Sequence, residues 1–186
     1  MHLTAKTAVL SFGLAASLSL AGCAQSDRAV IPTAVSSSAT VFKSDADALA
    51  AAKKAYLAYL AVSDQILVDG GANSKRLLTV ATPEELKAQI PGFSEFQTNK
   101  WHGAGRTTIE SFRLEGFFPT QREGIVSAYV CVDVSGVNVL DAAGSSVVSA
   151  TRPSLQPFEA TFDLKTRNSK TLVVASQKPW TSGGVC

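Results

Sequence analysis

Residues 126–136 read VSAYVCVDVSG, and apolar side chains alternate with other side chains along this stretch. A period of two is typical of a β-strand, in which successive side chains point to opposite faces of the sheet. Ala128 and the valines therefore share one face, which we expect to be the core face, whereas Cys131 lies on the other. The stretch predicts a strand that buries one face and carries a cysteine on the opposite one.

The same alternation recurs on both sides of this stretch. Residues 158–164 read FEATFDL, and residues 172–176 follow as a partner strand across a turn at 166–170, where Asn168 suits the turn. Residues 106–118 predict an earlier strand that Gly116 interrupts. The second half of the chain therefore predicts an antiparallel sheet of roughly four to five strands.

The residues before the strands carry helical signals. Ser44 is placed to cap a helix over Asp45–Val68, which ends at Asp69-Gly70-Gly71. Apolar residues follow mainly at three- and four-residue steps along it: Leu49, Ala52, Tyr56, Leu57, Tyr59, Leu60, Ile66 and Leu67. Thr82-Pro83-Glu84-Glu85 starts a second helix with a capping box, and we expect this helix to be short and to end before Pro91. Residues 74–80 predict another turn or two.

Helices followed by strands predict the α+β class, with the long helix and short helices packed on an antiparallel sheet. The chain has 186 residues, 46% of them hydrophobic, and a formal net charge of +2. This length and composition predict a single folded domain over residues 41–186. Because no block of like charges occurs, the sequence gives no electrostatic case for nucleic-acid binding.

The first 22 residues predict a signal peptide. Lys6 precedes an uncharged run over residues 7–21, which is shorter than the roughly 20 apolar residues that cross a bilayer. Leu20-Ala21-Gly22-Cys23 follows at the end of this run and resembles the lipobox of bacterial lipoproteins. The resemblance implies cleavage before Cys23 and a diacylglyceryl group on its thiol. An ordinary secretory signal with a cysteine nearby is the alternative.

Residues 23–40 are rich in Ser, Ala and Thr and have no helical or strand period. We therefore expect a lipidated flexible tether. Two acyl chains give stable membrane anchoring, whereas one gives only reversible binding. The expected location is the outer face of the bacterial cell membrane, and the expected contact with the membrane is the lipid anchor.

Two cysteines remain after Cys23, namely Cys131 and Cys186. We predict a disulfide between them, because disulfides persist in exported proteins. Closing this loop stabilises the fold by about 4 kcal/mol in the chain-entropy model. Two free thiols and metal ligation are the alternatives. The mature chain has one histidine, His102, and no Cys-x-x-Cys spacing, so we expect no metal.

The order of elements resembles the cystatin-like or NTF2-like cone, as found in small secreted lipoproteins of high-GC Gram-positive bacteria. The resemblance rests on Asp69-Gly70-Gly71, on residues 129–136, and on Pro179-Trp180 followed by Cys186. It implies a sheet that curves around the long helix. It implies no activity, because this fold serves enzymes, carriers and partner-binding subunits alike.

Catalytic motifs are missing from the sequence. It contains no Gly-x-Ser-x-Gly elbow, no Ser-x-x-Lys pair and no phosphate-binding loop, and Gly103-Ala104-Gly105 does not continue into a dinucleotide fingerprint. Glu84 and Glu85 are explained by their place at a helix N-terminus. We therefore expect no catalytic residue and no cofactor.

The candidate ligand-binding residues are Trp101, His102 and Arg106, with Tyr56 and Tyr59 on the long helix. Trp101 to Arg106 places an aromatic ring, the mature chain's histidine, a flexible backbone and a cation between the helices and the first strand. The alternative is that Trp101 packs on the sheet rim, His102 is a solvated loop residue and Arg106 forms a surface ion pair. The tyrosines have core packing as their alternative.

Two classes of function remain. The first is a surface-anchored, non-catalytic accessory domain that binds a small apolar ligand or a protein partner. The second is a small cone-fold enzyme of the isomerase or dehydratase type, which needs an acid or base in its cavity. We favour the first class and expect no titratable side chain to point into the cavity. A buried carboxylate within hydrogen-bond reach of a Tyr or His would reverse this preference.

Overall fold

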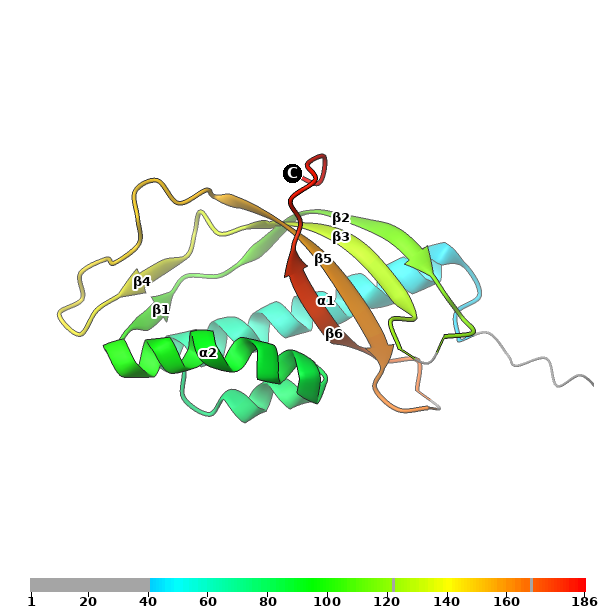
Figure 1. Cartoon of the computed structure of the whole chain (residues 1–186), viewed down its shortest axis with the longest axis horizontal. Coiled ribbons are helices and arrows are strands. Elements are labelled where there is room, and N and C mark those ends of the chain that lie inside the picture. The colour runs from blue at the N-terminus through cyan, green and yellow to red at the C-terminus, as the bar shows by residue number, and fades with distance from the viewer. Residues whose placement is uncertain (1–40, 122, 168) are drawn as a thin grey trace, which may run out of the picture. The chain divides into compact units, whose positions relative to one another are not determined.

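Helices cover one face of a four-stranded antiparallel sheet in the computed structural model, which describes residues 41–121, 123–167 and 169–186 (Figure 1). The helices are α1 (Asp45–Val68) and α2 (Pro83–Asn99), joined through a 3-10 helix, η1 (Ser74–Thr79). The sheet has the order β2-β3-β5-β6. Its strands are β2 (Thr108–Phe117), β3 (Val126–Asp133), β5 (Leu155–Leu164) and β6 (Leu172–Pro179). The α+β class is therefore confirmed.

Helix α1 has the bounds that its caps predict. The Ser44 hydroxyl accepts from the Asp47 amide at 3.2 Å, and the helix ends at Asp69. Gly71 lies in the left-handed region with φ +80°, and a Cβ there would lie 2.0 Å from the Phe93 carbonyl oxygen. The chain can therefore leave α1 beside α2 only with glycine at this position.

The buried stripe of α1 consists of small and aromatic side chains: Ala48, Ala52, Ala55, Tyr56, Tyr59, Leu60 and Ile66. The expectation that Leu57 shares this stripe is wrong, because its side chain is 48% exposed. Successive helical residues differ in direction by about 100°. Since Tyr56 points into the core, its neighbour Leu57 is turned away from it.

Helix α2 is longer than expected and continues through Pro91 to Asn99. The expected end before Pro91 is wrong for a physical reason. The proline ring lies on the exposed side of the helix, and tertiary contacts hold the turns beyond it. Phe93 is buried, and the Gln97 side-chain amide donates to the Gly71 carbonyl at 2.7 Å. These contacts offset the hydrogen bond that a proline cannot donate.

The side chains of β3 alternate between the two faces of the sheet, as the sequence predicts. Val126 and Val130 are fully buried against the helices, and β3 pairs with β2 on one side and β5 on the other. The β5–β6 hairpin closes with a backbone hydrogen bond, in which the Lys165 amide donates to the Thr171 carbonyl at 2.8 Å. Asn168, expected in this turn, lies outside the described residues.

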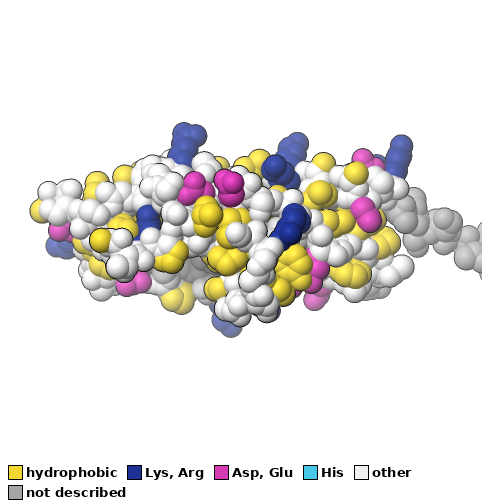
Figure 2. All heavy atoms as spheres, turned by 90° about the horizontal axis from the view of Figure 1, so that it is seen from above, with side chains coloured by type: hydrophobic (Ala, Val, Ile, Leu, Met, Phe, Trp, Pro, Cys, Tyr) yellow, Lys and Arg dark blue, Asp and Glu magenta, His cyan; other side chains and the backbone are white. Residues whose placement is uncertain are grey.

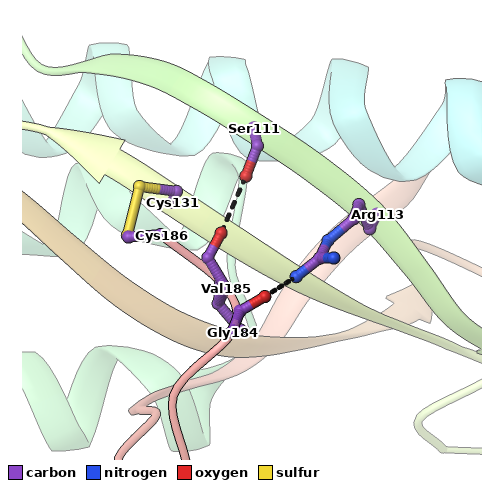
Figure 3. The surroundings of a disulfide bond; sticks show 6 residues. All are labelled: Ser111, Arg113, Cys131, Gly184, Val185 and Cys186. Atoms are coloured by element: carbon purple, nitrogen blue, oxygen red, sulfur yellow. Dashed lines mark hydrogen bonds between the residues drawn. A yellow bond between two sulfur atoms is a disulfide. The ribbon is translucent and has the colours of Figure 1, made fainter.

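The C-terminal tail covers part of the sheet face opposite the helices. Seen from the C-terminal side, the surface carries separate groups of hydrophobic side chains between basic and acidic ones (Figure 2). Cys131 and Cys186 are paired, as predicted, with their Cα atoms 5.2 Å apart (Figure 3). Ser111 donates to the Val185 carbonyl at 3.1 Å, and Arg113 donates to the Gly184 carbonyl. The tail is therefore attached to both β2 and β3.

A second, two-stranded sheet has no counterpart among the expectations. Strand β1 (His102–Ala104) pairs with β4 (Asn138–Leu140) in antiparallel register. The expectation of a flexible loop over Trp101 to Arg106 is therefore wrong in part. The two strands have three residues each, too few to show a period in the sequence.

Residues 1–40 lie outside the described part of the chain, so the signal peptide, Cys23 and the tether remain predictions. Among the residues that are described, no helix has the length and apolar character needed to cross a membrane.

Candidate functional site

A cavity of about 280 Å³ lies between the helical layer and the sheet, and we call it the inter-layer cavity. Helix α1 contributes Tyr56, Tyr59, Ser63 and Asp64, and α2 contributes Phe93, Glu95 and Phe96. Strands β5 and β6 add Gln156, Phe158 and Gln177. The lining is thus mainly aromatic and aliphatic, with a few polar groups, which is typical of small-molecule sites.

The two tyrosines of α1 place their hydroxyl groups on polar partners across the core. Tyr56 donates to the Gln177 side-chain carbonyl at 2.6 Å, and Tyr59 donates to Oε1 of Glu85 at 2.6 Å. Burial, and after it the negative charge of Glu85, raises the pKa of both tyrosines. Both phenols therefore stay protonated, and each gives its hydrogen to a protein partner.

Glu85 is the buried carboxylate that joins these elements. Its side chain is only 2% exposed, and its oxygens accept from Tyr59, from the Gln89 amide at 2.8 Å and from the Gln177 backbone N–H at 3.1 Å. A buried charge is tolerated where donors surround it in this way. Glu85 itself does not line the inter-layer cavity, because Tyr59 and Gln89 stand between it and the open space.

Two expectations about carboxylates are corrected by this geometry. The capping box is only half formed: the Glu85 amide donates to the Thr82 hydroxyl at 3.3 Å, but the carboxylate turns inward to Tyr59. The statement that helix capping explains Glu85 is therefore incomplete. The expectation that no titratable side chain points into the cavity is wrong, because Asp64 and Glu95 line it. In addition, the buried Glu85 carboxylate lies within hydrogen-bond reach of Tyr59.

Two further carboxylates border the cavity. Asp64 is half-buried and accepts from both the amide and the hydroxyl of Thr107, at 2.9 and 2.7 Å. Glu95 is exposed, as is Gly92, and these two residues mark the side that opens to solvent. Among the described residues that line the cavity, none is Lys, Arg or His.

Ser63 supplies a hydroxyl that the fold leaves available. Its oxygen is buried and lies close enough to the Tyr59 hydroxyl to lower the pKa of that phenol slightly, against the larger effects of burial and Glu85. No hydrogen bond of ordinary geometry joins the Ser63 hydroxyl to another described residue. Buried hydroxyls normally have a partner, so each exception requires an explanation. The position of Ser63 on the cavity wall makes a ligand or a water the natural partner.

The segment from Trp101 to Arg106 does not form one site. Trp101 packs edge-on against Phe96, with ring centroids 5.9 Å apart, and the exposed His102 has Nδ1 at 3.3 Å from the Val68 carbonyl. These two residues line a broad, open hollow. Arg106 lines a different hollow on the outer side of α1, and no ion pair joins it to a carboxylate in the described ranges. Of the candidate residues, only Tyr56 and Tyr59 lie in the inter-layer cavity.

The sequence does not predict several of the polar residues in the cavity and behind its wall. Ser63 and Gln177 belong to no motif, and Gln177 lies beyond the expected end of its strand. Glu85 carried a sequence signal, but that signal pointed to a helix N-terminus. Only the three-dimensional approach of α1, α2 and β6 brings these groups together.

Comparison with protein-family models, curated proteins and solved structures finds no match to this chain. The chemistry of the site therefore has to be interpreted from its own geometry. That geometry offers a half-open cavity with apolar walls, hydrogen-bond acceptors and negative charge, which suit the reversible binding of a small molecule.

Proposed function

We propose that the chain is an exported lipoprotein whose folded domain binds a small ligand without transforming it. The inter-layer cavity is the observation that carries the proposal. Its aromatic and aliphatic walls, broken by the Ser63 hydroxyl and the Gln156 side chain, combine the features of a ligand site. No serine, cysteine or lysine paired with a base lies on its described lining, so acyl transfer has no support there.

The lipid anchor is the second part of the proposal and rests on Leu20-Ala21-Gly22-Cys23. A diacylglyceryl group on Cys23 would keep the domain at the outer surface of the cell membrane. The pairing of Cys131 with Cys186 is consistent with this oxidising compartment. Replacing Cys23 by Ser tests the anchor, because the variant should leave the membrane fraction. A variant that still partitions with membranes would contradict lipidation.

The fold proposal is the cystatin-like or NTF2-like cone. Its support is the single long helix α1 laid along an antiparallel sheet, with a cavity between the two. In such a fold the concave side of a curved sheet is a natural ligand site. The same proposal includes that residues 41–186 form a single α+β domain.

A small enzyme is the second candidate, and the contact between Glu85 and Tyr59 favours it. An isomerase or dehydratase of this fold needs a buried carboxylate within hydrogen-bond reach of a Tyr or His, and this pair supplies one. However, the Glu85 carboxylate already accepts from three donors and lies behind the cavity wall. A general base has to reach the proton that it removes, so binding without catalysis agrees better with this geometry.

A thermal-shift screen on the full-length protein in detergent tests the proposed function. Ser63→Leu should fill part of the cavity, and Ser94→Leu makes the same change on the exposed side of α2. We expect a ligand that stabilises the wild type and Ser94→Leu but not Ser63→Leu. Stabilisation of all three proteins alike, or of none by any compound, would contradict binding in the cavity.

The same ligand separates binding from catalysis. After prolonged incubation with the wild type, the ligand should be recovered unchanged by mass spectrometry. Conversion that stops in a Tyr59→Phe variant would replace the binding proposal by the enzyme.

A further inference from the structure

We propose that the inter-layer cavity selects an organic ammonium ion, a cationic nitrogen carried on a compact apolar body. This inference rests on the proposed function, because it specifies the class of ligand for the same cavity. It follows from the charges around the cavity, from its aromatic walls and from the direction of its hydroxyl groups.

The charge of the lining is negative. Asp64 and Glu95 line the cavity, and the buried Glu85 lies directly behind Tyr59. The basic residues nearby in sequence face elsewhere. Lys178 is exposed and follows Gln177 on β6, so strand alternation directs it to the opposite face. Arg106 does not line the cavity but a neighbouring hollow, which shares Asp64 and Thr107 with it. An anion in the cavity would therefore meet carboxylates with no cation among the described lining residues.

Five aromatic residues border the cavity, namely Tyr56, Tyr59, Phe93, Phe96 and Phe158. Phe96 and Phe158 are partly exposed, whereas the other three are buried and stand behind them. The face of an aromatic ring attracts a cation that approaches within about 6 Å of its centre, and the attraction grows when both are shielded from water. Groups of aromatic rings are a recurring way to bind quaternary ammonium ions. A neutral apolar ligand would use the rings but would not offset the negative charges of Asp64 and Glu95.

The tyrosine hydroxyl groups use their hydrogens within the protein, so they can offer a ligand only acceptor oxygens. Tyr56 and Tyr59 give their hydrogens to Gln177 and Glu85, so toward any further group their oxygens can only accept. The Ser63 hydroxyl lies beside the Tyr59 oxygen. Asp64 also retains acceptor capacity after binding Thr107, because a carboxylate has about four acceptor positions. The polar part of the cavity therefore accepts hydrogen bonds more readily than it donates them.

Three probes of the same shape test the inference on the full-length protein in detergent. They are choline, its uncharged carbon analogue 3,3-dimethylbutan-1-ol, and the carboxylate anion 3,3-dimethylbutanoate. Ligand-observed NMR titration should give choline at least about tenfold tighter binding than the alcohol and no measurable binding of the anion.

Matched variants locate the effect. Phe158→Leu keeps an apolar side chain but removes an aromatic face, and Glu95→Gln removes one charge at the opening; each should weaken choline binding by about threefold to tenfold. Glu110→Gln, on the exposed surface of β2, makes the same change in net charge and should leave choline binding unchanged. Equal weakening by Glu110→Gln would show only a general charge effect and would overturn the inference.

The outcomes separate this inference from the proposed function. Equal affinity for choline and the alcohol, or no binding of choline, would overturn the selection of a cation. The proposal of a ligand site would still stand if the thermal-shift screen finds a ligand that Ser63→Leu excludes. If that screen also fails, the ligand site itself is wrong.

Discussion

At the scale of single residues, Glu85 connects the two helices with the sheet. Its carboxylate accepts hydrogen bonds from Tyr59 on α1, from Gln89 on α2 and from the Gln177 backbone on β6. A donor that loses its acceptor inside a protein costs more than the hydrogen bond contributed, because it cannot return to water. This one side chain therefore fixes the spacing of the elements that enclose the cavity.

Glu85→Ala should destabilise the protein strongly, because it leaves the buried Tyr59 hydroxyl and two partly buried N–H donors without their acceptor. We expect the free energy of unfolding to fall by about 3 kcal/mol, measured by urea unfolding. Glu84→Ala is the matched control, since Glu84 is exposed in the same helical turn and should cost less than about 1 kcal/mol. Equal effects of the two substitutions would contradict the role of Glu85.

Tyr56 and Tyr59 predict a loss of stability at alkaline pH. The pKa of each is raised, by burial first and then by Glu85, so the folded protein keeps two protons that the unfolded chain releases above about pH 10. Stability is complete below that pH and falls as the pH rises beyond it, by about 2.7 kcal/mol per pH unit for two protons. Urea unfolding at rising pH measures the slope. A Tyr56→Phe, Tyr59→Phe double variant with the wild-type slope would contradict this explanation.

At the scale of elements, the length of α2 decides whether the cavity has a second wall. Phe93 and Phe96 lie beyond Pro91, and both line the cavity. A helix that ended before Pro91, as its sequence predicts, would leave the sheet and α1 without this cover. The continuation past the proline is therefore a requirement of the site.

Phe93→Ala tests this continuation. Phe93 is 5% exposed, so its truncation should lower the free energy of unfolding by about 3 kcal/mol in urea. Ser94→Ala, one position further on the exposed side, should change it by less than about 0.5 kcal/mol. A negligible effect of Phe93→Ala would mean that the second half of α2 does not pack as described.

The sequence predicts those elements whose signals are local. The caps of α1, the alternation of β3 and the pairing of Cys131 with Cys186 are all visible in neighbouring residues or in a count. The path of α2 through Pro91 and the inward turn of Glu85 depend on contacts with residues far away in the chain, such as Gly71 and Gln177. For the same reason, the sequence identifies two tyrosines of the cavity but not the residues that face them.

At the scale of the whole molecule, the disulfide ties the C-terminus to the sheet. Cys131 is fully buried, and Val185 next to Cys186 is also buried, so the tail belongs to the packed structure. At the start of the tail, the Trp180 ring packs against the Tyr129 ring, with the ring centroids 4.6 Å apart. The tail therefore covers part of the sheet face that the helices leave open.

Removing the disulfide should lower the free energy of unfolding by about 4 kcal/mol, because the reduced chain gains the entropy of an open loop. A Cys131→Ala, Cys186→Ala double variant provides the measurement in urea, with the wild type kept oxidised as the reference. A loss below about 1 kcal/mol would mean that the tail holds its place without the covalent bond.

The central claim is that an anchored, oxidised domain presents its cavity outside the cell. Intact-protein mass spectrometry on the chain isolated from its own cells, with and without alkylation of free thiols, tests this claim most directly. We predict a chain that begins at Cys23, carries the diacylglyceryl mass and takes up no alkylating agent at Cys131 or Cys186. A chain that retains residues 1–22 and is alkylated at both of these cysteines would contradict the account.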